Sequence, residues 1–379
     1  KTVMITGDHV ETAFAIAKQL GIANSMNECI TGDELEKMSD EKLGEQCEDL
    51  SVFARVSPTH KVRIVKAFRA RGNVAAMTGD GVNDAPSLKS ADIGIAMGKC
   101  GTDVAKNAAD IILTDDNFAT IEKAIEEGRG IYENIKKSVL FLLSSNFGEI
   151  ITMFLAVSAG LSSPLKASHI LWVNLITDSL PALALGVDEN DGKMLMDKPP
   201  RNSTESLFAG GGLFLTLFYG CLIAAVSLIA FFSVPYAFLN GQGAAFTLGN
   251  IRAALSYQEV LMRAQTYAFT VLGISELFHA IGMRNVEKSF FTNHPFSNKL
   301  MIAAFTVGIG LQVLVTEIPY FNLAFETVHL SFGEWVGLTF LSSMPLIAHE
   351  MLLFNPVSWL KKLHKSKDNK ENATEPGKI

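Results

Sequence analysis

The chain contains 379 residues, of which 48% are hydrophobic and 19% are charged, and its mean hydropathy is +0.25. Such a composition is too apolar for an ordinary soluble protein. The formal net charge of -7 averages two unlike parts, since charge concentrates in residues 1–137 and in the segment after Leu360. This negative net charge does not indicate nucleic-acid binding.

Residues 1–116 alternate short apolar runs with helical patterns, which is typical of a parallel α/β sheet. Helices are expected over 10–20 and 58–69. Ser57 is a suitable N-cap for the second helix, and proline at position 58 suits its first turn. The expected strands are 2–6, 51–56, 74–78, 93–97 and 110–113.

Residues 117–137 carry apolar side chains at three- and four-residue steps among charges, which predicts an amphipathic helix. This stalk helix is expected to run without a proline into the first of six apolar stretches. Each stretch has about the 20 residues that a bilayer demands. The predicted spans are 138–160, 168–187, 210–232, 265–283, 299–317 and 334–353, followed by a polar tail over 354–379.

Basic residues are more frequent in the loops and tail that lie on the same side of the predicted membrane as residues 1–116. By the positive-inside rule, this places the α/β part and the tail in the cytoplasm. The tail is expected to be disordered after Lys365. The cysteines show neither CxxC pairs nor loop clusters, which argues against disulfides or zinc and fits a reducing cytoplasm. They are Cys29, Cys47, Cys100 and Cys221.

Polar groups follow the ends of two expected strands, where active sites of parallel α/β sheets lie. These groups are Thr6-Gly7-Asp8 and Thr78-Gly79-Asp80. Phosphoryl transfer needs a Mg²⁺ held by carboxylates, a cation against the phosphoryl group and small hydrogen-bond donors. Lys61 is the candidate cation, and Thr6 and Gly7 are the candidate donors. Taken singly, a Thr-Gly-Asp turn or a lysine is more often structural.

The run over 77–86, MTGDGVNDAP, is far more specific. It places Asp80 and Asp84 four residues apart on a glycine-rich turn, where Gly79 and Gly81 permit a tight backbone path. These two aspartates are the candidate Mg²⁺ carboxylates.

Ionisable and amide side chains also occur within the apolar stretches, where they are costly and mark functional sites. Pro181 follows three of them and weakens its helix, which can free backbone carbonyls for ion binding. All the candidates offer oxygen ligands, a set that suits a hard cation such as Ca²⁺ better than a soft metal. The candidates are Asn146, Glu149, Asn174, Thr177, Asp178 and Glu276.

Other polar residues of these stretches are assigned differently. His279, one turn from Glu276, is expected to be a hydrogen-bonded packing residue rather than a ligand. Glu317 and Glu350 lie near stretch ends and are interpreted as structural. For the candidate amides and Thr177, interhelical hydrogen bonding is the competing interpretation.

These motifs resemble those of the P-type ATPases, specifically the calcium-transporting branch. The resemblance continues through SSNFGE and WVNLITDSLPA in the first two apolar stretches and covers nearly the whole chain. The soluble motifs, in order, are MITGD at 4–8, FARVSPTHK at 53–61, MTGDGVNDAPSLKSADIGIAMG at 77–98 and GTDVAK at 101–106.

The resemblance implies a partial haloacid-dehalogenase-like (Rossmann-like) phosphorylation domain followed by a six-helix membrane bundle. It implies that Asp80 contacts Mg²⁺ with support from Asp84, and that Thr78, Gly79 and Asn83 belong to the cofactor-binding loop. It also implies a Ca²⁺ site built from the candidate residues of the apolar stretches, with Glu276 matching less strongly than the others. Whether one ion or two move per cycle is left open.

The function implied is ATP-driven export of Ca²⁺ through an aspartyl-phosphate, in a multi-pass protein of a bacterial cell membrane. No Asp-Lys-Thr-Gly sequence occurs in the 379 residues. The chain is therefore expected to work with ATP, the lipid bilayer and a missing N-terminal part, and to be catalytically incompetent alone. Alternatives are a P-type pump for H⁺, Na⁺ or Mn²⁺, a non-catalytic fragment and, least favoured, a soluble phosphatase.

Overall fold

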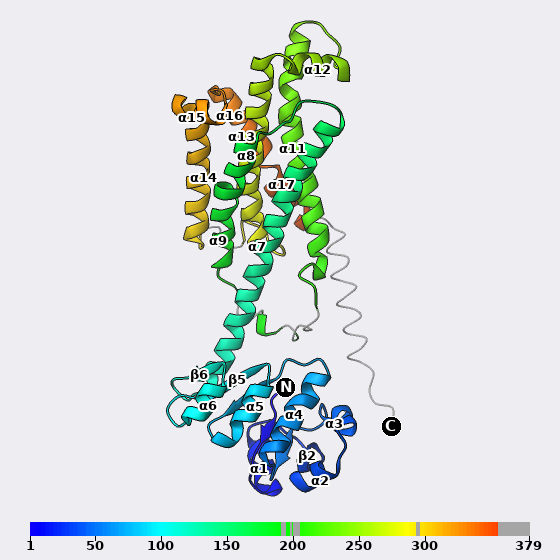
Figure 1. The fold of residues 1–379 in the computed structure, drawn as a ribbon, viewed down its shortest axis with the longest axis vertical. Coiled ribbons are helices and arrows are strands. Elements are labelled where there is room, and N and C mark those ends of the chain that lie inside the picture. Colours follow the sequence, from blue (N-terminus) through cyan, green and yellow to red (C-terminus); the bar gives the residue numbers. More distant parts are fainter. Residues whose placement is uncertain (191–194, 198, 200–204, 293–295, 355–379) are drawn as a thin grey trace. The chain divides into compact units, whose positions relative to one another are not determined.

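The structure is a computed structural model that describes residues 1–190, 195–197, 199, 205–292 and 296–354 (Figure 1). The predicted tail over 354–379 lies outside these residues apart from its first. The chain divides into two compact units, Lys1–Glu126 with Met196–Glu205 and Glu127–Leu195 with Ser206–Ile379. Each unit is described by itself.

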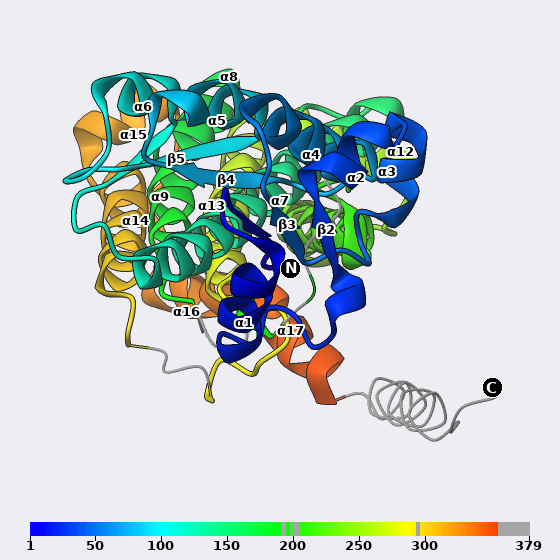
Figure 2. The same cartoon turned by 90° about the horizontal axis from the view of Figure 1, so that it is seen from below.

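The first unit contains two parallel three-stranded sheets (Figure 2). All five predicted strands are present, while the strand β2 was not predicted. One sheet has the order β1-β3-β2, formed by Met4–Ile5, Val52–Ala54 and Cys29–Thr31. The other has the order β4-β5-β6, formed by Ala76–Gly79, Ile93–Met97 and Ile111–Leu113.

Short helices connect these strands, and α4 shows why its sequence begins a helix where it does. The hydroxyl of Ser57 accepts the N–H of His60, and Pro58 occupies the first turn, where no intrahelical donor is needed. The helices are α1 (Val10–Gln19), η1 (Met26–Glu28), α2 (Gly32–Lys37), α3 (Asp40–Gln46), α4 (Pro58–Ala70), η2 (Val82–Asp84), α5 (Ala85–Ser90) and α6 (Asp103–Ala108).

Strand β3 is buried on both faces because helices cover both sides of its sheet. Val52 and Ala54 pack against Ala13 of α1, whereas Phe53 packs against Ile64 of α4. This alternation is the two-residue period of a strand. It fixes the register of β3 between β1 and β2, and so the position of the loops that follow their carboxyl ends.

The second unit is a bundle of helices that α7 enters from the first unit. Helix α7 runs unbroken over Ala119–Ser158, as predicted for the stalk and first span. The other elements are α8 (Ala167–Trp172), the π-helix η3 (Val173–Thr177), α9 (Ser179–Gly186), η4 (Ala209–Gly211), α11 (Gly212–Gly241), α12 (Leu248–Leu255), α13 (Gln258–Met283), α14 (Lys299–Glu317), α15 (Pro319–Phe325), α16 (Phe332–Ser342) and α17 (Met344–Phe354).

Four helical segments of the described residues are long and apolar enough to cross a membrane, so the predicted count of six is not confirmed. The stretch over 168–187 is broken into α8, η3 and α9, and the stretch over 265–283 lies in the more polar α13. The four segments are Ala119–Ser158, Ala209–Gly241, Lys299–Glu317 and Phe332–Leu353.

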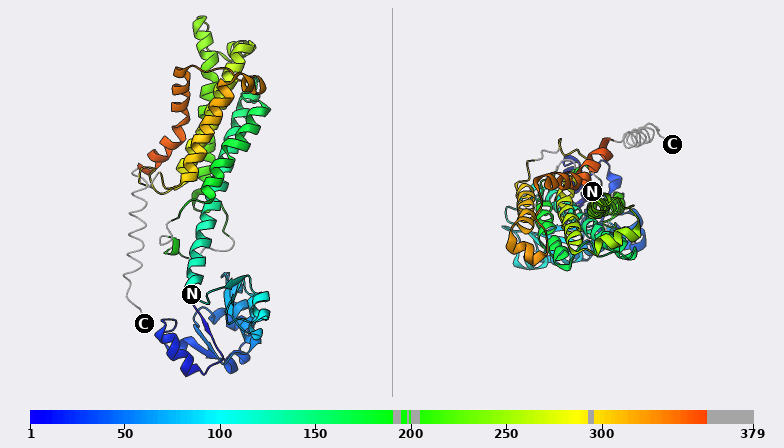
Figure 3. Two further views of the ribbon diagram at one scale, coloured as in Figure 1. Left: turned by 90° about the vertical axis from the view of Figure 1, so that its left-hand side faces the viewer. Right: turned by 90° about the horizontal axis from the view of Figure 1, so that it is seen from above.

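Helix α13 is polar because its neighbours cover it on most sides. It packs against α9, α11, α14, α16 and α17 within the bundle (Figure 3). Residues are buried along nearly its whole length. Its polar side chains therefore face other helices, where they find partners or define sites. The buried ones include Gln265, Thr266, Thr270, Ser275, Glu276 and His279.

Helices α7 and α11 approach closely through two glycines. A Cβ on Gly148 would lie 2.9 Å from the side chain of Ile223, and one on Gly220 would lie 2.7 Å from that of Phe147. Both distances are shorter than real contacts, so the crossing requires glycine on each helix.

A buried ion pair joins the ends of α9 and α13. The guanidinium of Arg284 donates to Asp188 at 2.9 Å, and both residues are 5% exposed. The amide of Asn298, at the start of α14, donates to the same carboxylate at 2.8 Å. Asn134 of α7 donates to the backbone carbonyl of Asp188 at 2.7 Å. One polar cluster thus fastens four helices.

We expect Asp188→Ala to destabilise the chain by about 3 kcal/mol, because it leaves the buried guanidinium of Arg284 unpaired. Thermal unfolding of the purified chain in detergent measures the loss. The control is Glu326→Gln, which removes the largely exposed partner of Lys166 and should leave the unfolding temperature nearly unchanged. Equal losses in both variants would contradict this assignment.

Candidate functional site

The predicted cation and one predicted carboxylate of the first unit form an ion pair. Lys61, in the first turn of α4, donates to Oδ1 of Asp84 at 2.5 Å. The N–H groups of Gly81 and Asp80 donate to Oδ2 at 3.1 and 3.3 Å. Burial raises the pKa of Asp84, but Lys61 and these N–H groups outweigh it, so the pKa lies below its ordinary value.

Asp80 is placed differently from Asp84. It is exposed just beyond the end of β4, and its side chain has no hydrogen-bond or ion-pair partner among the described residues. Its backbone carbonyl accepts the N–H of Thr102 at 2.8 Å, which ties this loop to the start of α6. Asn83 is also exposed, whereas Thr78 and Gly79 form the end of β4.

The Thr6-Gly7-Asp8 loop follows β1 in the other sheet. The hydroxyl of Thr6 donates to the Asp8 carboxylate at 2.9 Å and accepts the Asp8 N–H at 3.1 Å. Nothing lies within 4 Å of where a Cβ on Gly7 would stand. Ile5, directly before this loop, packs into the same core as Met77 of β4. The two strand ends therefore share one core, although no hydrogen bond among the described residues joins their loops.

The two predicted Mg²⁺ carboxylates of the first unit differ in what they offer to an ion. The exposed oxygens of Asp80 are available to the ion, whereas both oxygens of Asp84 are already engaged. Asp84 therefore suits a supporting role, in which it orients Lys61 and the Asp80 turn.

Gly79 is required by the approach of Asp84, since a Cβ at this position would lie 2.5 Å from the Asp84 Cβ. We expect Gly79→Ala to displace Asp84 and to destabilise the loop by about 1–3 kcal/mol. Hydrogen exchange of the segment 76–84 in the full chain measures this effect. Gly44→Ala is the matched control, because its Cβ meets nothing within 4 Å in α3. Faster exchange in both variants, or in neither, would refute the prediction.

A second carboxylate organises the loop between β5 and α6. Asp116, at a φ of 55°, accepts the N–H groups of Gly98, Lys99 and Cys100 at 2.6–2.9 Å. The Lys99 N–H, with those of its two neighbours, outweighs partial desolvation and lowers the pKa of Asp116 to about 2.

The depressed pKa of Asp116 predicts an acid dependence of stability. Its contribution is fully present above the ordinary value of about 4 and is lost as the pH falls through about 2. Asp116→Asn should therefore be less stable than the wild type at pH 6, and the difference should shrink below pH ~4. Hydrogen exchange of the segment 97–103 at several pH values tests this. Asp49→Asn, at an exposed position, should show no such convergence.

In the second unit, Glu149 of α7 meets Asn174 of η3. The Asn174 amide donates to both Glu149 oxygens, at 3.0 and 3.1 Å, and also to the carbonyl of Ile170. Glu149 is 5% exposed. The wide π turn contributes to this placement, since the Asp178 N–H bonds to the Val173 carbonyl five residues earlier.

Asp178 and Glu276 are buried beside each other and close enough to Glu149 to interact with its charge. None of the four oxygens of Asp178 and Glu276 has a hydrogen-bond partner among the described residues. Thr177 lies beside Glu276, and its hydroxyl donates to the Val173 carbonyl at 2.9 Å. We call Glu149, Asn174, Thr177, Asp178 and Glu276 the acid cluster.

Ser145 and Gln312, which the sequence did not assign to this site, are among the described residues whose buried oxygens have no hydrogen-bond partner. Ser145 lies beside Asp178. By contrast, Asn146 makes no hydrogen bond to the acid cluster among the described residues, and its amide donates to the Leu142 carbonyl of its own helix at 2.8 Å.

The remaining polar predictions are confirmed as structural contacts. His279 hydrogen-bonds with the Ser144 hydroxyl at 2.7 Å. Glu317 accepts the indole N–H of Trp335 at 2.8 Å, and Glu350 accepts the Ser289 hydroxyl at 2.6 Å.

Across the described residues, no group of three or more His, Cys, Asp or Glu side chains has a geometry that could hold a metal ion. Both oxygens of Glu149 already accept hydrogen bonds from Asn174. A cation that bound Glu149 would have to share these oxygens with Asn174 or displace its amide.

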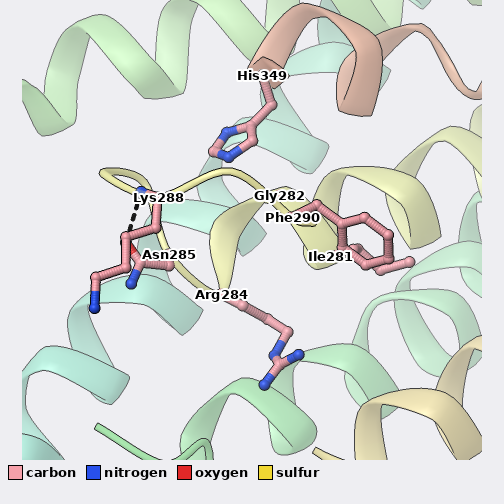
Figure 4. Close-up of a pocket in the computed structure, with 7 residues that line it drawn as sticks. All are labelled: Ile281, Gly282, Arg284, Asn285, Lys288, Phe290 and His349. Atoms are coloured by element: carbon pink, nitrogen blue, oxygen red, sulfur yellow. Dashed lines mark hydrogen bonds between the residues drawn. The ribbon is translucent and has the colours of Figure 1, made fainter. Parts of the chain in front are cut away.

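A separate small pocket lies at the end of α13 (Figure 4). Its volume of about 10 Å³ leaves room for about one water molecule. It shares no residue with the acid cluster. The pocket is lined by Ile281, Gly282, Arg284, Asn285, Lys288, Phe290 and His349.

Two families match the chain. The family described as cation transporting ATPase, C-terminus, matches residues 162–354, which is just over half of the chain. The chain belongs to the cation-transporting ATPase family. A second family, haloacid dehalogenase-like hydrolase, matches residues 1–92. This match confirms the predicted haloacid-dehalogenase-like fold for that part of the first unit.

Members of the family from bacteria and yeast resemble the chain over most of its length. Calcium-transporting ATPase 1 of Bacillus cereus is 52% identical over 352 residues, 93% of this chain and 39% of that protein. The calcium-transporting ATPase of Bacillus subtilis is 44% identical over 354 residues, with 93% and 37% covered. Calcium-transporting ATPase 1 of Saccharomyces cerevisiae is 38% identical over 376 residues, with 98% and 36% covered.

The chain thus spans about two fifths of the length of these curated relatives. Their similarity confirms the predicted resemblance to the calcium-transporting P-type ATPases.

Proposed function

We propose that the chain provides the cation path and part of the phosphoryl-handling site of an ATP-driven P-type pump that exports Ca²⁺ from the cytoplasm. The observation that carries this proposal is the acid cluster. Asp178 and Glu276 bury four carboxylate oxygens without a hydrogen-bond partner among the described residues. Uncompensated buried charge is strongly unfavourable, and a bound cation would compensate it.

The chemistry of the cluster favours Ca²⁺ as the transported ion. Its members offer oxygen from carboxylate, amide and hydroxyl groups, and Ca²⁺ takes six to eight oxygens in a flexible geometry. Mg²⁺ demands a stricter octahedral arrangement and gives up water reluctantly. The most similar relatives described above are named calcium-transporting ATPases. The main alternative is a pump of the same family for H⁺, Na⁺ or Mn²⁺.

In the first unit, we assign Asp80 as the Mg²⁺ contact and Asp84 as its support. Bound Mg²⁺ would neutralise charge that develops on the transferring phosphoryl group. Lys61 would hold a phosphoryl oxygen, and the Thr6-Gly7-Asp8 loop would present backbone donors to it. Thr78, Gly79 and Asn83 would shape the loop that meets the ATP-derived phosphate.

The proposed setting is a bacterial cell membrane, with the first unit in the cytoplasm and the acid cluster within the bilayer. The proposed partners are ATP, Ca²⁺, lipid and the remainder of the same enzyme, including its phosphorylated aspartate. Six crossings remain part of this proposal. In it, α8, η3 and α9 together form one interrupted span, and the continuous helix α13 forms a further span. Helix α7 would transmit changes between the two proposed sites.

The proposal predicts that Glu149→Gln, Asp178→Asn and Glu276→Gln each weaken Ca²⁺ binding at least about tenfold, because each removes a charged oxygen ligand. Binding of radiolabelled Ca²⁺ to the purified chain in lipid nanodiscs measures this, and competition by Mn²⁺, Na⁺ or acid separates the alternative ions. Glu350→Gln is the matched control, since its carboxylate bonds to Ser289 and the Phe290 N–H outside the cluster.

An unaltered affinity in all three cluster variants would refute the site. If the wild-type chain binds Mn²⁺ or Na⁺ but not Ca²⁺, that ion replaces Ca²⁺ as the proposed transported ion.

A further inference from the structure

Gln312 is a polar residue in the middle of the apolar helix α14, and it is fully buried. Its Nε2 group donates to the hydroxyl of Thr270 at 3.4 Å. Its Oε1 atom has no hydrogen-bond partner among the described residues. The hydrogen bond to Thr270 uses the donor of this amide, but the buried acceptor Oε1 is left uncompensated, which is costly unless another group binds it.

The Oε1 atom of Gln312 lies near Gly273 of α13. A Cβ on Gly273 would lie 3.5 Å from Oε1 of Gln312, and 3.6 and 3.9 Å from Cγ2 and Oγ1 of Thr177. The amide oxygen and the Thr177 side chain therefore both lie near the position that a side chain on Gly273 would occupy. The lack of a side chain on Gly273 leaves them facing a common space.

The same face of α13 carries Glu276, one turn after Gly273. Thr177 lies beside Glu276, and Glu276 lies beside Asp178. The unpartnered oxygen of Gln312 is therefore linked to the acid cluster through Thr177, which lies near it and beside Glu276. Ordinary sequence periodicity gives no sign of this, because the rotation of α14 about its axis decides which way position 312 faces.

We propose that Gln312 supplies a neutral oxygen to the cation site from α14 and sets its selectivity for a large divalent cation over a small one. This inference rests on the proposed function. A neutral ligand raises the number of coordinating oxygens without adding charge, which suits Ca²⁺ with its six to eight ligands. Mg²⁺ gains less, since its octahedral shell accepts fewer ligands and keeps its waters.

The test uses the full chain in nanodiscs, with radiolabelled Ca²⁺ as the probe and Mg²⁺ as the competitor. Gln312→Met keeps the length and flexibility of the side chain but removes its oxygen. We expect Ca²⁺ affinity to fall about tenfold while Mg²⁺ affinity changes little, so that the selectivity ratio falls by a similar factor. Thr270→Val is the matched control, because it removes the partner of Nε2 and leaves Oε1 in place.

A structural role would give the opposite pattern. The inference is overturned if Gln312→Met keeps the wild-type selectivity ratio, or if Thr270→Val lowers the ratio as much as Gln312→Met does. If Gln312→Met does not fold, as judged by size-exclusion chromatography, Gln312→Asn replaces it. This variant keeps the amide but withdraws its oxygen by one methylene, and it is judged by the same two outcomes.

Asp178→Asn distinguishes this inference from the proposed function. If the wild type does not bind Ca²⁺, or if Asp178→Asn leaves binding intact as Glu149→Gln and Glu276→Gln do, the proposed function fails and the role of Gln312 fails with it. If Asp178→Asn abolishes binding while Gln312→Met leaves affinity and selectivity unchanged, only the role of Gln312 is refuted.

Discussion

The second unit is organised around carboxylates that the folded chain buries without satisfying. Asp178 and Glu276 have no hydrogen-bond partner among the described residues, which is a large cost in the interior of a bundle. Such a cost persists only where the surrounding structure holds the groups in place. The support is visible in the glycine crossing at Gly148 and Gly220 and in the Asp188 cluster, which fastens the ends of four helices.

The interruption between α8 and α9 also helps to position the acid cluster. Pro181 has no N–H for the carbonyl of Thr177, four residues earlier, so a regular α-helix cannot continue unchanged through this point. The chain instead forms the π turn of η3, with a hydrogen bond from Asp178 to Val173. Proline was correctly read from the sequence as a weak point, but the irregular turn lies before it, where Asn174 and Thr177 are presented to neighbouring helices.

The sequence predicts best where one periodicity dominates. The helix over 299–317 and the strand over 93–97 have the bounds that were expected, since both are predominantly apolar between clear breaks. The three-residue strand β2 was missed because it is too short to show a period. The sequence of helix α13 resembles a membrane span only in part, because the helix contains many polar residues. Neighbouring helices bury these residues, and the sequence alone does not reveal which helices those are. The Lys61–Asp84 pair and the orientation of Gln312 likewise depend on tertiary packing.

One continuous helix, α7, contains residues of both units. Helix α7 contains no proline and no break from Ala119 to Ser158, so its two ends cannot change independently without bending or shifting the whole element. Glu149, which it carries, is bound through Asn174 to the irregular turn η3. A cation that draws Glu149 away from Asn174 would change the contact of α7 with that turn. Any free energy that this change transmits along α7 must act equally in the reverse direction, because coupling between two binding sites is reciprocal.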